Sequence, residues 1–204
     1  MRWVIQHAPS LRSIETMNLT GYGRILHQRP LKKIGFFCAI GQPQQEEYQF
    51  LQHHAQLGAE SHLQEIKCIL HSISERDSWI FLIPKLTQLK TLELCFARND
   101  LSIELLKTFL QKVSEGCMAL ENVAVKSIVF PSSSEWIRHL SNHRDLQEMI
   151  IDTTHIPDHL MIELEGFSHL KRLDLKYHIK DWHSLTQLKH RIPNLVYTNK
   201  PSPI

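Results

Sequence analysis

Short runs of alternating hydrophobic and polar residues recur along the whole chain, and all follow one template. The template has hydrophobic residues at its first, fourth and sixth positions, as in "LKTLEL" at Leu89 and "LKRLDL" at Leu170. Copies with substitutions begin at Leu11, Leu31, Leu63, Leu120 and Leu146, and "LVYTNK" at Leu195 is a weaker eighth copy. Neighbouring copies begin 20 to 32 residues apart. Such self-similarity at a near-constant interval indicates a stack of similar structural units.

The alternation within each copy predicts a short strand with one buried face. The residues between copies predict helices, most clearly in "DLSIELLKTFLQKVSEG", where four apolar residues share one helical face: Ile103, Leu106, Leu110 and Val113. Asp100 or Ser102 is expected to cap this helix, and Gly116 is expected to end it. Similar helices are predicted over 44–57, with Tyr48, Leu51 and Ala55 on its apolar face, over 134–142 and over 182–191.

No single strand–helix unit buries its own apolar face, so consecutive units must stack into a solenoid. We expect an α/β fold in which parallel strands line the concave side and helices cover the convex side. The solenoid is predicted to span residues 1–198, followed by a polar tail over 199–204. The third, fifth and seventh positions of each copy are then expected to point to the concave side.

The template resembles that of the leucine-rich repeat family, and specifically the ribonuclease-inhibitor-like or cysteine-containing repeats of F-box proteins. Those families often place proline or cysteine just before the strand, as this chain does at Pro9, Pro30, Cys117 and Pro193. In those families asparagine or cysteine usually follows the strand's last leucine by three residues. The repeats of this chain carry different residue types at that position. The resemblance therefore implies a horseshoe of about seven to eight irregular repeats.

The segment "IPDHLMIELEGFSHLKRLDL", from Ile156 to Leu175, also resembles the opening of an F-box. Proline followed by an acidic residue suits the first turn of any helix, however, and "LKRLDL" follows at the interval that the other copies predict. We interpret the segment as the helix and strand of the seventh repeat, and expect any F-box to lie outside these residues.

Composition narrows the class of protein. Hydrophobic content is 42% and charged content 22%, as in ordinary globular proteins, and the net charge is only +2. Nucleic-acid binding and membrane binding are therefore not expected, and no apolar run is long enough for a transmembrane helix. The four cysteines lie far apart and no signal peptide is evident. We expect reduced thiols and a monomer in the cytoplasm or nucleus.

The residue pattern offers little for catalysis. Two histidine pairs have the i, i+4 spacing of metal ligands, namely His139 with His143 and His155 with His159. No third ligand lies nearby in sequence, so we expect these side chains, like His53 and His54, to be solvated. There is no glycine-rich phosphate loop, and Cys68 is expected to be a core residue. We therefore predict no catalytic residue, cofactor or metal, and no enzyme.

The candidate function is protein binding on the concave face. The seventh positions are apolar in the first four copies, at Met17, Phe37, Ile69 and Cys95, and charged in the next three. Together with fifth-position residues, the predicted contacts are Met17, Phe37, Ile69, Cys95, Lys67, Glu93, Ile150 and Asp174. The competing interpretation is that the seventh position is half-buried at the strand edge. Full burial of Phe37 and Ile69 would exclude the binding role.

The resemblance implies a role as the substrate-recognition region of an F-box-type ubiquitin-ligase adaptor. The alternative is a ribonuclease-inhibitor-like scaffold or inhibitor that binds a folded protein without any link to ubiquitin. An F-box elsewhere in the full gene product would favour the first of these functions.

Overall fold

The computed structural model describes residues 7–16, 19, 21–38, 45–70, 79–96, 103–126, 135–154, 156, 158–167, 169–177, 182–192 and 194–199. Within that part, eight strands form one parallel sheet in which the strand order follows the chain. The strands are β1 (Ser13–Thr16), β2 (Lys33–Cys38), β3 (Glu65–Leu70), β4 (Thr91–Phe96), β5 (Asn122–Lys126), β6 (Glu148–Asp152), β7 (Arg172–Tyr177) and β8 (Leu195–Asn199). Every predicted copy thus contains a strand.

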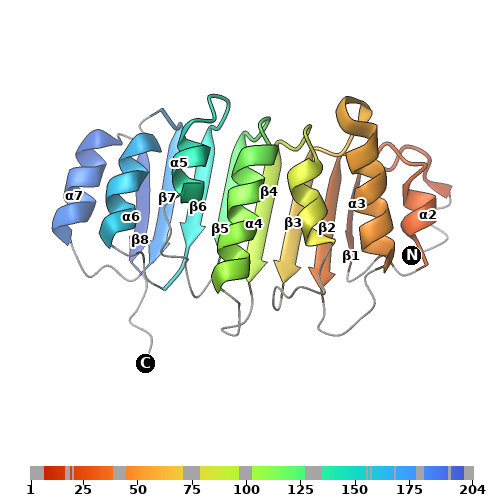
Figure 1. Cartoon of the computed structure of the whole chain (residues 1–204), viewed down its shortest axis with the longest axis horizontal. Helices are drawn as coiled ribbons and strands as arrows, with labels where there is room; N and C mark the ends of the chain where they lie inside the picture. Colours follow the sequence, from red (N-terminus) through yellow and green to blue (C-terminus); the bar gives the residue numbers. More distant parts are fainter. Residues whose placement is uncertain are drawn as a thin grey trace.

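The helices all lie on one side of this sheet (Figure 1). They are α2 (Gly23–Leu26), α3 (Gln45–Leu57), α4 (Ile103–Gly116), α5 (Glu135–Ser141), α6 (Asp158–Glu163) and α7 (Trp182–Arg191), with 3₁₀ helices η1 (Gly58–Glu60), η2 (Ile80–Lys85) and η3 (Leu164–Phe167). The four helices predicted from sequence are confirmed as α3, α4, α5 and α7. The expected caps of α4, Asp100 and Ser102, lie outside the described residues.

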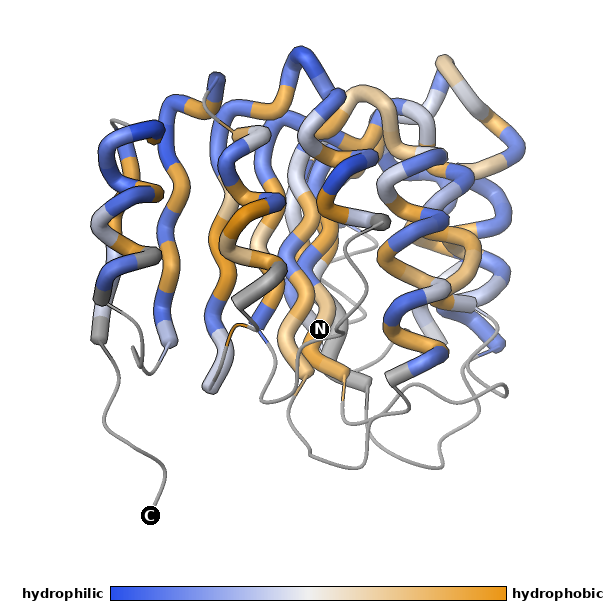
Figure 2. The backbone as a smooth tube through the Cα atoms, turned by 60° about the vertical axis from the view of Figure 1, so that its left-hand side comes forward, coloured by the Kyte–Doolittle hydropathy of each residue, from blue (hydrophilic) through white to orange (hydrophobic). Residues whose placement is uncertain are grey.

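The core is a continuous apolar layer between the sheet and the helices. In the fourth repeat the three template positions, Leu89, Leu92 and Leu94, are all 0% exposed. Figure 2 shows hydrophobic and hydrophilic residues alternating along the strands, as this one-sided burial requires. Burying a leucine side chain contributes about 1.5–3 kcal/mol, so the repeated template is the main source of stability.

A regular backbone arrangement sets the register between repeats. The carbonyl oxygen of Arg12, at the second template position, accepts hydrogen bonds from the N–H groups of Lys32 (2.8 Å) and Lys33 (3.0 Å) in the next repeat. The same pair of bonds recurs at each junction up to the seventh repeat. Neighbouring repeats are therefore held with equivalent positions side by side, as seen for Ile34 beside Ile66.

The register corrects the phase of the eighth copy. Leu195 lies beside Leu173, which holds the fourth position of the seventh copy. Leu195 therefore fills a fourth position and not the first, and Ile192, which is 0% exposed, fills the first. The eighth copy is "IPNLVY", with Tyr197 at its sixth position. The predicted tail over 199–204 begins inside β8 and otherwise lies outside the described residues.

The segment that resembled an F-box folds as the helical side and strand of the seventh repeat. Its helical part comprises α6 and η3, and its last residues form β7. Leu160 and Leu164 are 0% exposed and face the same core as the other helices. The interpretation of Ile156–Leu175 as a repeat is confirmed.

Candidate protein-binding face

The sheet face that points away from the helices is formed by the third, fifth and seventh template positions, and we call it the concave face after the curvature expected from the sequence. Along β3 the side chains alternate strictly: Ile66, Cys68 and Leu70 are buried, whereas those between them are half-buried. The half-buried residues are Glu65, Lys67 and Ile69. Strands β4, β5 and β6 show the same alternation, so the concave face is continuous across the central repeats.

Glu93 lies at the centre of this face and is ion-paired on both sides. Its carboxylate is 2.5 Å from Lys126 Nζ and 3.6 Å from Lys67 Nζ. Partial burial would raise the pKa of Glu93, but the hydrogen bond and charge of Lys126, together with the charge of Lys67, lower it overall. The bond to Glu93 in turn raises the pKa of Lys126. The Glu93 carboxylate is therefore held in its charged form near neutral pH, between two basic side chains.

Two apolar pairs flank this charged centre. Ile69 on β3 lies beside Cys95 on β4, and Ala124 on β5 lies beside Ile150 on β6. All four side chains are half-buried. The face therefore presents half-buried apolar side chains next to the ion-paired carboxylate, toward the ends of β3 and β4 and across β5 and β6.

Of the predicted contact residues, Ile69, Cys95, Lys67, Glu93 and Ile150 lie together on the concave face and are half-buried. Ile69 therefore lacks the full burial that would have excluded a contact. Half-burial fits both interpretations of the seventh position, so the binding role of these residues stays a prediction.

Two of the predicted contact residues fall wholly or partly outside the described residues. Met17 lies outside the described residues, as does the side chain of Phe37, whose backbone belongs to β2.

Asp174 lies in its predicted row but is buried. It belongs to the fifth-position row, between Ile150 and Val196, but is only 2% exposed. Its Oδ2 atom accepts a hydrogen bond of 2.8 Å from Arg172 and lies 3.9 Å from Lys176 Nζ. Asp174 thus holds these two cations in place, and it is the cations that reach the surface.

The histidines correct the sequence analysis in two places. His143 is 2% exposed, with Nε2 2.6 Å from the Ser114 carbonyl oxygen, and His54 is 3% exposed. Both were predicted to be solvated, as His139 is. Burial lowers the pKa of both buried rings. The i, i+4 spacing of His139 and His143 therefore places one ring in solvent and the other in the core.

His155 and the side chain of His159 lie outside the described residues. Across the described residues, no three His, Cys, Asp or Glu side chains are grouped so as to hold a metal ion.

The described cysteines are free thiols, at Cys68, Cys95 and Cys117. Cys68 is a core residue, as predicted, and Cys117 donates its S–H to the Ile83 carbonyl oxygen at 3.3 Å. Burial raises the pKa of Cys117 to about 12, so this thiol is held in its unreactive form. Only Cys95, of these three, reaches the surface.

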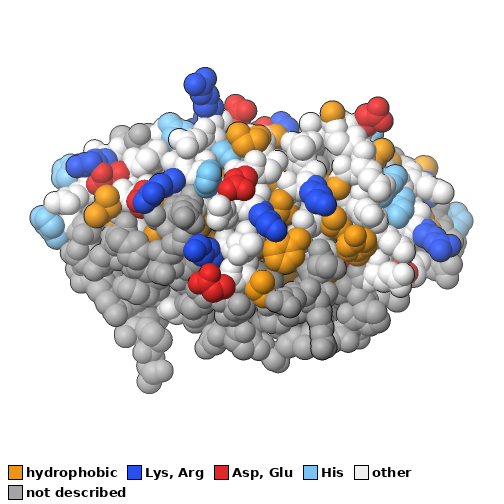
Figure 3. All heavy atoms as spheres, in the orientation of Figure 1, with side chains coloured by type: hydrophobic (Ala, Val, Ile, Leu, Met, Phe, Trp, Pro, Cys, Tyr) orange, Lys and Arg blue, Asp and Glu red, His pale blue; other side chains and the backbone are white. Residues whose placement is uncertain are grey.

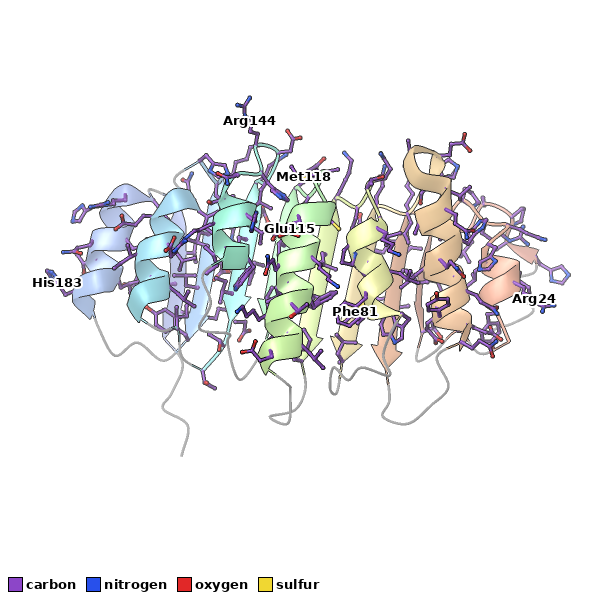
Figure 4. All side chains as sticks on the ribbon, viewed as in Figure 1. Arg24, Phe81, Glu115, Met118, Arg144 and His183 are labelled. Carbon is purple, nitrogen blue, oxygen red and sulfur yellow. The ribbon has the colours of Figure 1, made fainter. Side chains whose placement is uncertain are left out.

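The opposite surface, formed by the helices, carries acidic, basic and histidine side chains intermixed (Figure 3). Its most exposed apolar residues include Met118, in the turn after α4, at 60% exposure (Figure 4). No helix in the described ranges has the length and apolarity needed to cross a bilayer.

No protein-family model and no curated protein matches the chain. Among solved structures, an internalin (inlF) from Listeria monocytogenes str. 4b F2365 is similar, with a TM-score of 0.57 and 16% sequence identity. The match covers 96% of this chain and 50% of the internalin chain, so this chain spans about half the length of that protein. Together with the eight-stranded parallel sheet, this likeness identifies the fold as an α/β leucine-rich-repeat solenoid.

Proposed function

We propose that the chain is a non-catalytic module that binds a protein partner on its concave face. The observation that carries the proposal is the pairing of half-buried apolar residues, Ile69 with Cys95 and Ala124 with Ile150, next to ion-paired Glu93. Protein interfaces commonly combine apolar anchors at the centre with polar groups around them. Repeat solenoids offer such a surface over several consecutive repeats.

The charges of the face favour a protein over a polyanion. Nucleic-acid binding requires cations that are available to phosphates, whereas Lys67 and Lys126 are engaged by Glu93, and Arg172 and Lys176 by Asp174. The proposal therefore includes no nucleic acid and no membrane, and a monomeric chain. Free thiols at the three described cysteines support a cytoplasmic or nuclear location.

As the more specific role, we propose the substrate-recognition region of an F-box-type ubiquitin-ligase adaptor. Its support is the resemblance to cysteine-containing repeats, in which the cysteine before the strand is structural. Cys117 lies just before the template of the fifth repeat. Its thiol donates a hydrogen bond to the Ile83 carbonyl oxygen of η2 in the preceding repeat.

The binding role is tested by placing a photo-crosslinking amino acid at Ile69 or Ile150, and at Met118 as the control on the helix surface. We expect one protein to be captured from cells at both concave positions and not at Met118. Ile69→Arg combined with Ile150→Arg should then weaken binding of that purified protein about tenfold or more, and Met118→Arg should not. Equal capture at all three positions, or capture of nucleic acid, would refute the proposal.

The ubiquitin role is tested separately with the full gene product expressed in its host. We expect ligase scaffold subunits to co-purify with it, and the protein captured at the concave face to accumulate when the gene is deleted. Capture of the partner without scaffold subunits and without accumulation would favour the inhibitor or scaffold role.

A further inference from the structure

Three histidine rings pack together where α2 meets α3. The rings of His27 and His53 are stacked, with centroids 4.7 Å apart, and the rings of His53 and His54 meet edge to face at 5.5 Å. Phe50 lies against two of them, 5.9 Å from His27 and 4.6 Å from His54. The rings can stack in this way when they are neutral. Positive charges on two of them at this separation would repel each other.

His54 is the most buried of the three rings, and only one of its two nitrogens has a hydrogen-bond partner among the described residues. Its Nδ1 lies 3.0 Å from Ser61 Oγ, which also accepts the Leu63 N–H at 3.2 Å. Its Nε2 is buried and has no hydrogen-bond partner among the described residues. Protonation would place N–H groups on both nitrogens, so one buried donor would be left without an acceptor in contact with Phe50. An unpaired buried polar group of this kind is strongly unfavourable.

His27 has the same restriction on the facing element. It follows α2, is half-buried, and its Nε2 is also buried without a hydrogen-bond partner among the described residues. A positive charge on His27 would face His53 across the stacked pair and His54 behind it. The two rings with unpaired nitrogens thus lie on opposite sides of the contact between α2 and α3.

Several charged and titratable groups surround the cluster. The elements that pack against α3 are α2, η1 and η2. Besides His27 and His54, the titratable and charged groups on these elements are Arg24, Glu46, Glu47, Tyr48, His53, Glu60 and Lys85, and His62 lies just after η1.

The two carboxylates that α3 carries beside the cluster are already engaged. Glu46 accepts hydrogen bonds from the backbone N–H groups of Gly21, Tyr22 and Gly23, at 2.8, 3.1 and 2.8 Å. Glu47 accepts one from Leu19 at 2.7 Å through Oε1, and its buried Oε2 has no hydrogen-bond partner among the described residues. These bonds hold both carboxylates on the backbone around α2, and of the two only Glu46 counteracts the lowered pKa, at His27.

We propose that this cluster is a proton-sensitive latch: protonation of His27 and His54 releases α2 from α3 and opens the first repeats, while the C-terminal repeats stay folded. Each repeat of a solenoid contacts only its neighbours, so one end opens without unfolding the rest. The opening exposes Phe50 and Leu51, which are 0% exposed in the closed form.

The pKa shifts agree with this geometry. Burial, then the nearby His53, His27 and His62, lower the pKa of His54 to about 4. Burial and His53 also lower the pKa of His27, against an opposing effect of Glu46. A depressed histidine pKa means that the folded form binds fewer protons than the unfolded form. The stabilisation is therefore complete above the unfolded value of 6.5 and is lost as pH falls toward the folded value.

Hydrogen–deuterium exchange at pH 7.5 and pH 5.0, corrected for intrinsic rates, tests the latch. For His54 alone, pKa values of 6.5 and about 4 predict that protection of α3 amides falls about thirtyfold. Amides of β7 and α7, which lie away from the buried His143 in the middle of the chain, should change much less. His54→Phe should remove most of the pH-dependent loss in α3, and the exposed His190→Phe should leave it intact.

Two results would overturn the proposal. The first is an equal loss of protection in α3 and α7, which indicates global acid unfolding. The second is a pH-dependent loss of amide protection in α3 that is as large in the His54→Phe protein as in the parent. If His54→Phe does not fold, His27→Phe serves instead, because it removes the facing titratable ring and should likewise reduce the loss in α3.

Discussion

Gly116 gives the sharpest test of how closely the helix layer is packed. It is the last residue of α4 and lies against η2 of the preceding repeat. A Cβ atom at this position would be 2.1 Å from the Pro84 carbonyl oxygen and 3.0 Å from its carbonyl carbon. Both atoms belong to the backbone, so the clash is relieved only when α4 or η2 moves.

The expected effect of Gly116→Ala follows from two opposing contributions. Alanine is favoured over glycine in a helix by about 0.8–1 kcal/mol, and the described glycines with positive φ are Gly21 and Gly58, so Gly116 has no conformational need to be glycine. Overpacking in a well-packed interior costs about 1–3 kcal/mol, and more when backbone must move. Because the contact is with backbone, we take the upper end of that cost and expect a net loss of about 2 kcal/mol, against the roughly 5–15 kcal/mol typical of a domain.

Urea denaturation followed by circular dichroism measures this change. The matched control is Gly166→Ala in η3, where the nearest atoms are the side-chain Cβ and Oγ of Ser141, at 3.1 and 3.2 Å. Because a side chain shifts more easily than backbone, the control should stay within about 1 kcal/mol of the parent. A Gly116→Ala protein as stable as the parent, or more stable, would refute the close approach of α4 to η2.

Four further substitutions, the last two compared as a pair, test other parts of the fold by the same denaturation assay. Glu46→Gln should destabilise by about 1–2 kcal/mol, because it removes the charge from a carboxylate bound by three backbone N–H groups; an unchanged midpoint would contradict those bonds. Leu94→Ala should cost about 2–5 kcal/mol, as a 0% exposed core residue, and a loss below 1 kcal/mol would be inconsistent with that burial. Ile192→Ala should be clearly destabilising and Thr198→Ala nearly neutral, whereas the reverse order would restore the original phase of the eighth copy.

The repeat template predicted the fold because one physical requirement acts at every copy. A strand that packs one face on helices must bury the fourth and sixth positions of its template. Leucines at those positions, such as Leu92 and Leu94, therefore indicate the strand in the sequence, and both are 0% exposed in the structure. The eighth copy was placed three residues late because Leu195 matches either a first or a fourth position. Only pairing with Leu173 in the neighbouring strand decides between them, and that pairing is a tertiary contact.

The buried histidines were missed because histidine was assigned to the surface by residue type and not by helical position. In α3 the buried residues are Glu47, Phe50, Leu51 and His54, which lie three or four residues apart. The predicted apolar face shared only Leu51 with this set. His54 lies four residues after the apolar Phe50 and so on the same face of the helix, and this spacing is the signal that places His54 in the core.

Half-burial of the seventh row was the competing interpretation from the sequence, and the burial of Asp174 was not predicted. Its template position gave the correct face. Its burial depends on Arg172 and Lys176, whose side chains lie on the same strand and pair with it. Such side-chain packing follows from the folded geometry and has no counterpart in the repeat template.

The central claim, that alternate strand residues form an open concave face which a partner covers, is tested most directly by thiol alkylation with N-ethylmaleimide and peptide mass mapping. In the free chain we predict that Cys95 reacts, while Cys68 and Cys117, both 0% exposed, do not react until the protein unfolds. In the complex with the crosslink-identified partner, Cys95 should become protected. Reaction of Cys68 as fast as Cys95 in the free chain, or an undiminished rate at Cys95 in the complex, would contradict the account.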